Sequence, residues 1–400
     1  MDKYQDLRTP CFVYDAKELH DNINAFQEAM HFAWNGKTAV GLSVKTAPIV
    51  EIASFARKLG CMAEVVSDEE FQLALDAGFN PKEIIFNGPI KSRNWLKYAL
   101  LHEAVVNLDS EREIQYACDF AREHSVVPRV GLRVNFDLEK ICPGETIAED
   151  EGSRFGFCLE DGSLKRAIEK LRVSNVEPAG LHVHFSTKTH SPAVYNAIAS
   201  MLCNIASLFE LRSLEYLDLG GGYYGGGTNR SAYGEYVKNI IAGLDRFPGR
   251  EELTLICEPG GSVLCTAGEY VGKVIDVKSV RGRIFVVTEL SKLNLNSTVF
   301  SRRAFTCDYY RFKSTSPVPI QTICGYTCVE MDRLQDIENE ALLSRGDIVV
   351  VRNAGAYTVS FAPGFFIKHS PEIYMREADG VYRQIACGSY HTDSVNPPSM

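Results

Sequence analysis

Residues 39–45 read Ala39-Val40-Gly41-Leu42-Ser43-Val44-Lys45, a short apolar run that ends in a lysine. Its length and composition are typical of a buried parallel strand. Similar runs recur up to residue 258, with helical patterns between them: Ala39–Val44, Met62–Val66, Glu83–Phe86, Ala104–Asn107, Arg129–Val134, Ala179–His184, Glu215–Leu219 and Thr254–Glu258. Such strand–helix repeats over about 220 residues predict a (β/α)8 barrel, which typically needs about 250 residues. An open doubly wound sheet is the alternative.

Local signals place helices between these runs. Ser67 opens an S-x-x-E capping box before a helix over Asp68–Ala77. Pro48 occupies a favourable first-turn position for a helix over Ile49–Leu59, and a further helix is predicted over Val194–Phe209.

The pattern changes after residue 262, where β-branched runs are separated by turns without long helical patterns. These runs are Tyr270–Val277, Arg283–Val287, Val318–Cys324, Asp347–Val351 and Val381–Gln384. They predict an all-β domain, and the early run Cys11–Tyr14 is a candidate strand of the same domain. We therefore expect a barrel domain over residues 25–262 and a β domain formed by residues 1–24 and 263–400.

Composition excludes several classes of protein. The net charge of −9 and the absence of Lys/Arg runs argue against nucleic acid or an acidic membrane surface as a partner. We find no signal-peptide pattern near the N-terminus and no apolar stretch of about 18 residues that would span a membrane. The 12 cysteines form no C-x-x-C pair, so reduced thiols in the cytoplasm are expected.

The active site of a (β/α)8 barrel lies at the carboxyl ends of its strands. Polar or conformationally special residues gather at those predicted ends: Lys45, Glu64, Asn87, Asp109, Asn135, His184, Gly220, Gly221, Gly222 and Glu258. Their coincidence at one rim is the main argument for an enzyme.

Single residues at this rim allow two interpretations. Lys45 would be a partly desolvated amine suited to a Schiff base, or a structural partner of a carboxylate such as Glu64. The three glycines over 220–222 would bring backbone N–H groups close to a phosphate, or would allow tight packing. Glu258 would pair with a pyridine nitrogen, or form an ordinary salt bridge. The sequence Leu181-His182-Val183-His184 puts two imidazoles on one strand face. They would bind a metal, or one of them would stack on a flat cofactor.

Taken together, these residues resemble the fold-type III pyridoxal-phosphate (PLP) decarboxylases, the group that contains diaminopimelate and ornithine decarboxylases. The resemblance covers nearly the whole chain and rests on eight motifs in the family's order. Six are Thr9–Tyr14, Ser43–Ala47, Ser153–Gly156, His182–Phe185, Gly220–Gly222 and Glu258–Gly260. The other two lie in the predicted β domain: Gly325–Asp332 resembles G-P-x-C-x-x-x-D, and Asn353–Tyr357 resembles D-x-G-A-Y.

The resemblance implies an alanine-racemase-like barrel with pyridoxal 5'-phosphate as cofactor. Lys45 would form the Schiff base. Cys328 would donate a proton after CO2 is lost, reaching the site from the partner subunit of a homodimer with shared active sites. Further cofactor contacts would be His184, Gly220, Gly221, Gly222, Glu258, Gly260 and Tyr357; candidate substrate contacts would be Glu64, Val329 and Asp332. No metal is expected.

Departures from the family pattern bear on the substrate. Gly261 stands where the family's E-P-G-R motif has arginine, and Val329 replaces the acidic residue after the catalytic cysteine. No motif residue corresponds to the arginine that binds a distal carboxylate in the family; Arg302 and Arg303 are the arginines near in sequence. The tail Ser360–Phe366 is apolar, as in relatives that act on modified or carrier-linked amino acids in specialised biosynthesis. We therefore expect such an atypical amino-acid substrate in preference to diaminopimelate, ornithine or lysine.

Other functions stay open at this point. An amino-acid racemase or epimerase of the same fold needs two bases on opposite faces of the cofactor, whereas Cys328 lies in a segment that resembles decarboxylases. A non-catalytic PLP carrier would lack the β domain. A regulatory pseudo-enzyme would typically have lost Lys45 or Cys328, and both are present.

Overall fold

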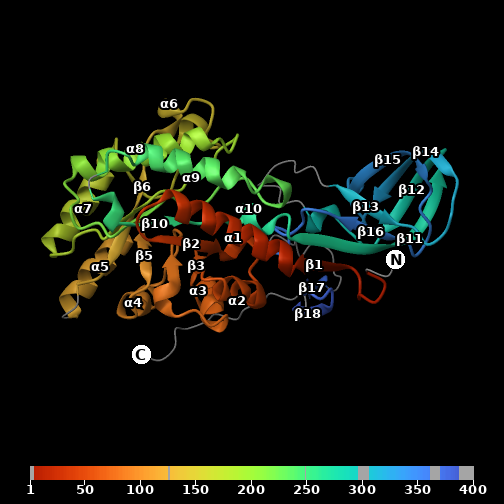
Figure 1. Ribbon diagram of the computed structural model, residues 1–400, viewed down its shortest axis with the longest axis horizontal. Helices are drawn as coiled ribbons and strands as arrows, with labels where there is room; N and C mark the ends of the chain where they lie inside the picture. The colour runs from red at the N-terminus through yellow and green to blue at the C-terminus, as the bar shows by residue number, and fades with distance from the viewer. Residues whose placement is uncertain (1–3, 125–126, 248, 296–305, 361–369, 387–400) are drawn as a thin grey trace. The chain divides into compact units, whose positions relative to one another are not determined.

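The computed structural model describes residues 4–124, 127–247, 249–295, 306–360 and 370–386. Among these, residues 21–262 form one compact unit, and residues 4–20 together with those after 262 form another. Figure 1 traces both units along the chain. We also predicted that the β domain completes the active site and forms the dimer, and this stays a prediction.

Parallel strands of the first unit close into a barrel, which confirms the (β/α)8 prediction and excludes the open doubly wound sheet. In ring order the eight strands are β2 (Thr38–Ser43), β3 (Met62–Val65), β4 (Ile84–Phe86), β5 (Val105–Leu108), β6 (Val130–Asn135), β8 (Gly180–His182), β9 (Tyr216–Asp218) and β10 (Thr254–Cys257). The ring closes because β5 pairs with β6 and β10 pairs with β2. The short strand β7 (Phe157–Cys158) pairs with β6 outside the ring.

Helix α1 precedes the first barrel strand and the other helices follow barrel strands; Figure 1 shows helices on both sides of the strands. The helices are α1 (Ala16–Ala33), α2 (Val50–Lys58), α3 (Asp68–Asp76), α4 (Arg93–Leu101), α5 (Glu111–Glu123), α6 (Leu138–Ile141), α7 (Ser163–Val173), α8 (Pro192–Leu208), α9 (Ala232–Gly243) and α10 (Gly261–Leu264). The Ser67 hydroxyl caps α3 by accepting the Glu70 amide at 3.2 Å, as predicted. The Glu70 carboxylate reaches one residue further back than a capping box requires and accepts the Val66 amide at 2.9 Å.

A tyrosine fills part of the barrel interior. The Tyr216 ring from β9 occupies the space that side chains at Gly131 and Gly180 would need, because a Cβ at either position would lie within about 2.2 Å of it. Its hydroxyl donates to Oδ1 of Asn107 at 2.8 Å. The glycines of β6 and β8 are thus explained by one large residue on β9, which is the neighbour of β8 and lies two strands from β6.

The second unit is a mixed β-sheet. Its strands are β1 (Cys11–Asp15), β11 (Gly268–Val280), β12 (Arg283–Thr288), β13 (Cys307–Tyr310), β14 (Pro317–Cys324), β15 (Arg333–Ala341), β16 (Ile348–Val351), β17 (Glu372–Arg376) and β18 (Tyr382–Ala386). The early strand β1 joins this sheet, antiparallel to β11 and parallel to β17. The prediction of a second, β domain is confirmed, although β13, β15 and β17 were not predicted.

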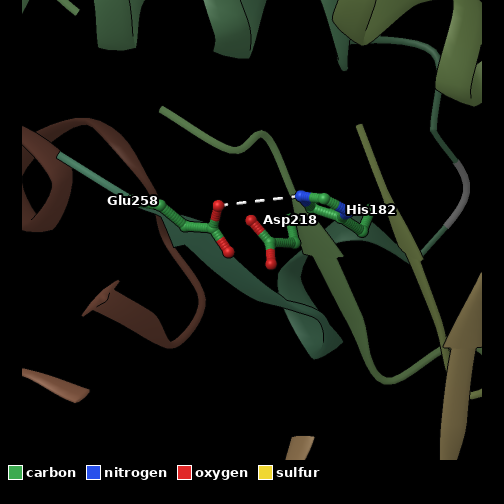
Figure 2. Close-up of side chains that lie close together, drawn as sticks. All are labelled: His182, Asp218 and Glu258. Carbon is green, nitrogen blue, oxygen red and sulfur yellow. Dashed lines mark ion pairs between the residues drawn. The ribbon is translucent and has the colours of Figure 1, made fainter. Parts of the chain in front are cut away.

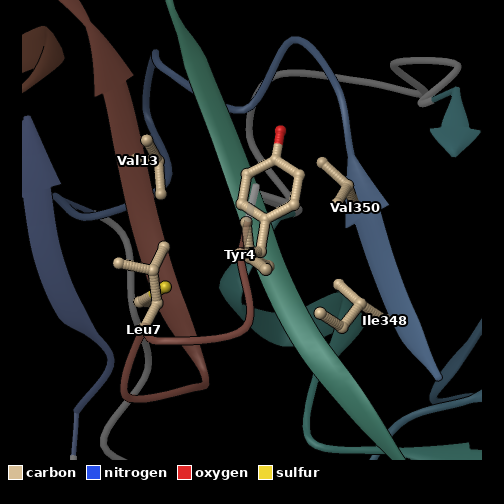
Figure 3. Close-up of a cluster of buried hydrophobic side chains, with 7 residues drawn as sticks. Tyr4, Leu7, Val13, Ile348 and Val350 are labelled. Atoms are coloured by element: carbon tan, nitrogen blue, oxygen red, sulfur yellow. The ribbon is translucent and has the colours of Figure 1, made fainter. Parts of the chain in front are cut away.

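A buried cluster forms one core of this unit (Figure 3), made by Tyr4, Leu7, Cys11, Val13, Val271, Ile348 and Val350. The Tyr4 ring lies among the aliphatic side chains, and its hydroxyl donates to Oε2 of Glu269 at 2.5 Å. None of the helices in the described ranges is long and apolar enough to cross a membrane.

Candidate active site

Lys45 follows β2 in a short 3-10 turn, where its amine meets the end of the neighbouring strand β3. The Lys45 Nζ lies 2.6 Å from Oε2 of Glu64 and 2.7 Å from Oγ of Ser43. The Ser43 hydroxyl also donates to the same Glu64 oxygen at 2.6 Å. Glu64 is buried, whereas the Lys45 side chain is 38% exposed. The amine is therefore held by a buried carboxylate, while part of the Lys45 side chain stays exposed.

Two asparagines extend this network across the barrel. Asn87 Nδ2 lies 3.3 Å from Oε1 of Glu64 and donates to Oε1 of Glu258 at 2.6 Å. Asn107 Nδ2 lies 2.9 Å from Oδ1 of Asn87 and 3.3 Å from Oδ2 of Asp218. Because all of these groups are buried, their hydrogen bonds fix the carboxylates in place.

Figure 2 shows His182, Asp218 and Glu258 converging from β8, β9 and the end of β10. All three side chains are buried, and one polar atom from each lies within 4.8 Å of the others. His182 Nε2 is 3.6 Å from Oε2 of Glu258. Three such groups would be close enough to share a cation, and our expectation of no metal stays a prediction.

The two carboxyl groups of this cluster differ in ionisation. Burial, followed by the charge of Glu258, raises the pKa of Asp218 well above its usual range. Burial also acts to raise the pKa of Glu258, but His182, the hydrogen bond with Asp218 and the charge of Lys45 together lower it to about 2. The opposite directions of the two pKa shifts favour one ionised and one protonated acid in this pair, with the negative charge on Glu258.

The triple glycine follows β9 and packs against its surroundings through the backbone. A Cβ on Gly220 would lie 2.6 Å from the Val183 carbonyl, and one on Gly221 would lie 2.6 Å from the Glu258 carbonyl. The Gly220 amide donates to Oδ1 of Asp218 at 3.0 Å. The Gly221 amide donates to Nδ1 of His184 at 3.1 Å. Two of the three amides that we expected to face a phosphate therefore have acceptors within the protein.

Gly260 and the lysine turn lie against each other. A Cβ on Gly260 would be 2.3 Å from Oγ1 of Thr46, so no other residue fits there without a shift. The Pro259 carbonyl accepts the Ser43 amide at 3.3 Å. The glycine of this motif is thus explained by its contact with the segment that carries Lys45.

The segment Ser153–Gly156 is held at the end of β6. Asn135 Nδ2 donates to the Ser153 and Phe155 carbonyls at 2.7 and 2.8 Å. Arg133 lies 4.5 Å from the Phe155 ring centroid, and its Nη1 is 3.3 Å from Oδ1 of Asp109. Arg133 thereby adds a buried positive charge to this end of the barrel.

The remaining predicted residues belong to the other unit. Cys328 is exposed and Val329 is half-buried in the loop between β14 and β15. Asp332 ends that loop and is buried. Tyr357 is half-buried, with a φ of 58° in the left-handed region that an aromatic residue rarely adopts. Arg302, Arg303 and the tail from Phe361 to Phe366 lie outside the described residues.

Several polar residues near Lys45 were not singled out by sequence reasoning. Ser43 and Asp218 are the last residues of β2 and β9, and Asn107 and Arg133 lie inside β5 and β6; none of them was assigned to the predicted rim. The signal was available, because a polar side chain inside a strand that is otherwise apolar marks a buried contact.

A barrel with a half-exposed lysine beside buried carboxylates, and an ionised Glu258 suited to a pyridine nitrogen, defines a site of the PLP type. Residues 17–265 match the family model described as "Pyridoxal-dependent decarboxylase, pyridoxal binding domain". The match covers more than half of the chain, and the chain belongs to this family of PLP-dependent amino-acid decarboxylases. The predicted family, enzyme class and cofactor are confirmed.

Individual relatives cover most of the chain at low identity. A probable chloroplastic diaminopimelate decarboxylase of Oryza sativa subsp. japonica is 28% identical over 397 residues, covering 96% of this chain and 79% of the relative. An L-glutamyl-[BtrI acyl-carrier protein] decarboxylase of Niallia circulans is 27% identical over 405 residues, covering 95% and 91%. The crystal structure of diaminopimelate decarboxylase from M. jannaschii superposes with a TM-score of 0.82 at 21% identity, covering 94% and 89% of the two chains. At that identity the superposition supports the fold alone.

Proposed function

We propose that Lys45 carries the cofactor covalently and that Glu258 faces its pyridine nitrogen. The observation that carries this assignment is the buried network in which Asn87 joins Glu258 to the Glu64 carboxylate that holds the Lys45 amine. The bound cofactor supplies an electron sink for the electron pair left behind when CO2 departs. Glu64 is committed to Lys45, Ser43 and Asn87, so we assign it to orienting the amine and not to contacting substrate.

His184 and Gly222 complete the proposed cofactor contacts in the barrel. Burial, with the charges of Arg133 and Lys45, lowers the pKa of His184 to about 3, so its ring is neutral and suited to lie against a cationic aromatic group. The amides of Gly220 and Gly221 already have acceptors, which leaves Gly222 as the glycine whose amide would face the phosphate. Tyr357 would add a hydroxyl donor.

Cys328 is the proposed proton donor after decarboxylation. Its thiol is exposed in its own chain, as a group that acts in a neighbouring active site must be. The assignment rests on the family resemblance of Gly325–Asp332 and includes a homodimer in which each subunit supplies Cys328 to its partner.

The proposed substrate is an amino acid with an extended or modified distal end, free or attached to a carrier protein. Val329 presents an aliphatic side chain where an acidic residue would pair a distal amine, so a substrate with that amine loses its partner. The Niallia circulans relative acts on a carrier-linked glutamyl group by its name, which is consistent with this proposal.

The cofactor assignment is tested by comparing Lys45→Ala with Lys37→Ala. Lys37 is exposed and precedes β2, so it is a control at the opposite end of the same strand. We expect the Lys45 variant to lose the visible absorbance of the bound cofactor and CO2 release, and the Lys37 variant to keep both. Normal turnover by Lys45→Ala would contradict the assignment.

The substrate proposal is tested by CO2 release from free and carrier-attached amino acids. We expect the wild type to prefer a modified or carrier-attached substrate over free meso-diaminopimelate, ornithine and lysine. Val329→Asp should increase turnover of ornithine or lysine relative to the wild type. Turnover of free meso-diaminopimelate by the wild type at the rates of metabolic enzymes, about 10 per second, would contradict the proposal.

A further inference from the structure

The loop Gly325–Asp332 connects the antiparallel strands β14 and β15 and carries Cys328 at its exposed part. Cys328, Glu330 and Met331 are all exposed, so the tip of the loop has little packing of its own. The position of the Cys328 thiol therefore depends on the contacts that hold the base of the loop.

The Asp332 carboxylate collects donors from two segments of the same unit. Its Oδ2 accepts the Thr327 hydroxyl at 2.6 Å, the Thr327 amide at 3.2 Å and the Ser291 hydroxyl at 3.0 Å. Its Oδ1 accepts the Lys292 amide at 2.7 Å. Asp332 is 5% exposed, so these bonds form where water competes little.

Backbone hydrogen bonds of Asp332 also close the base of this loop. The Gly325 amide donates to the Asp332 carbonyl at 2.8 Å, and the Asp332 amide donates to the Val329 carbonyl at 2.9 Å. A Cβ on Gly325 would lie 2.2 Å from Oδ2 of Asp332. The glycine that begins the motif thus makes room for the carboxylate that ends it.

From these contacts we infer that Asp332 is the positioning residue of Cys328, and not a substrate contact as expected from the sequence. Its carboxylate closes the base of the loop and ties it to Ser291 and Lys292, which begin three residues after the end of β12. The inference rests on the proposed role of Cys328, because the closed loop matters for catalysis only if the thiol delivers the proton.

The test uses the holoenzyme with Asp332→Asn and a matched control, Asp347→Asn. Asp347 is a buried aspartate of the same unit whose carboxylate accepts the Phe312 amide at 2.9 Å and the Ser344 amide at 2.7 Å. Both substitutions replace a buried acceptor oxygen by a donor, so both should lower the melting temperature. Only Asp332 closes the loop of Cys328.

We expect Asp332→Asn to speed hydrogen exchange of the Thr327 and Lys292 amides and to lower kcat by up to about 100-fold, the effect of misplacing a reacting group by about 1 Å. The visible absorbance of the cofactor should stay within about twofold, because the barrel residues proposed to hold it are untouched, whereas KM will follow the position of Val329 in the same loop. The solvent deuterium isotope effect on kcat should rise, since proton delivery becomes slower. Asp347→Asn should change none of these. Ser291→Ala, which removes a single donor, should give a smaller change in the same direction.

Unchanged exchange of these amides in Asp332→Asn would overturn the closure of the loop. Faster exchange with an unchanged kcat and isotope effect would overturn the positioning role. The proposed function fails by a different result, full activity of Cys328→Ala, which leaves amide exchange unaffected.

Discussion

The backbone amide of Gly221 donates a hydrogen bond to Nδ1 of His184, with 3.1 Å between the two nitrogens. An amide nitrogen only donates, so Nδ1 must accept and the ring hydrogen of a neutral imidazole must be on Nε2. The Tyr195 hydroxyl on α8 donates in turn to the Gly221 carbonyl at 2.8 Å. Gly221 is therefore held on both sides, by the imidazole at its amide and by the buried tyrosine at its carbonyl.

Tyr195→Phe should weaken cofactor binding without disturbing the fold. The substitution removes one hydroxyl and leaves the ring stacked on Tyr223, 4.8 Å between centroids. Loss of a neutral hydrogen bond costs about 1 kcal/mol, so we expect the dissociation constant of PLP to rise about fivefold. The measurement is recovery of visible absorbance when the apoenzyme is titrated with PLP. Tyr233→Phe is the control, because its hydroxyl donates to a carbonyl elsewhere, that of Ser262, at 2.9 Å. An equal loss of affinity in both variants would contradict a specific role for Tyr195.

The unequal ionisation of Asp218 and Glu258 gives a second prediction. Asp218→Asn should keep kcat within about tenfold, because an amide copies a neutral acid that donates a hydrogen bond. Glu258→Gln should lower kcat by about 100-fold or more, because it removes a charge placed to stabilise the reacting system. Steady-state kinetics on the two purified variants decide the matter. The assignment is wrong if Asp218→Asn loses as much activity as Glu258→Gln.

Glu70 predicts a pH dependence of stability. Burial, reinforced by the charge of Glu64 and opposed by that of Lys45, raises the pKa of Glu70 to about 7. Between about pH 4.5 and 7 the folded apoprotein holds a proton there that the unfolded chain has released, so stability falls as pH rises. We expect Glu70→Gln to gain roughly 1–3 kcal/mol over the wild type between pH 5 and pH 8 in urea unfolding. The exposed neighbour variant Glu69→Gln should follow the wild type. Parallel curves for Glu70→Gln and wild type would rule out this ionisation.

The barrel was predictable because its strands are buried on both faces and therefore appear as continuous apolar runs. Strand β15 was not, since its sequence Arg333-Leu334-Gln335-Asp336-Ile337-Glu338-Asn339-Glu340-Ala341 buries only Ile337 and pairs on one side with β14. A polar edge strand of this kind has almost no apolar pattern to detect. Composition thus identifies strands by their burial and misses those that are exposed.

The site residues, too, were predictable only where the strand that carries them has a recognisable apolar pattern. Lys45, His184 and Glu258 were found because each ends or follows a recognisable apolar run, and Glu64 because it is the one charged residue within the next run. What each one contacts was not predictable, since Asn87 and Asp218 meet Glu258 only after the barrel closes. Asp332 is a further example, because its place in the Gly325–Asp332 motif was recognisable, whereas its donors from Ser291, Lys292 and Thr327 were not predictable.

A fully buried ion pair gives the last prediction. Lys91 Nζ lies 2.9 Å from Oε2 of Glu113 and donates to the Gly88 carbonyl at 2.7 Å, and neither side chain of the pair is exposed. The same Glu113 oxygen accepts the Asp109 amide at 2.8 Å. Lys91→Met would leave a buried carboxylate without its cation.

We expect Lys91→Met to destabilise the protein by about 3–5 kcal/mol in urea unfolding. The double variant Lys91→Met/Glu113→Gln should recover much of this loss, because glutamine carries no charge and its carbonyl still accepts the Asp109 amide. Lys82→Met, which breaks the exposed pair with Glu103, should leave the urea midpoint almost unchanged. If the double variant were no more stable than Lys91→Met, the loss would come from the packing of the lysine and not from an unpaired charge.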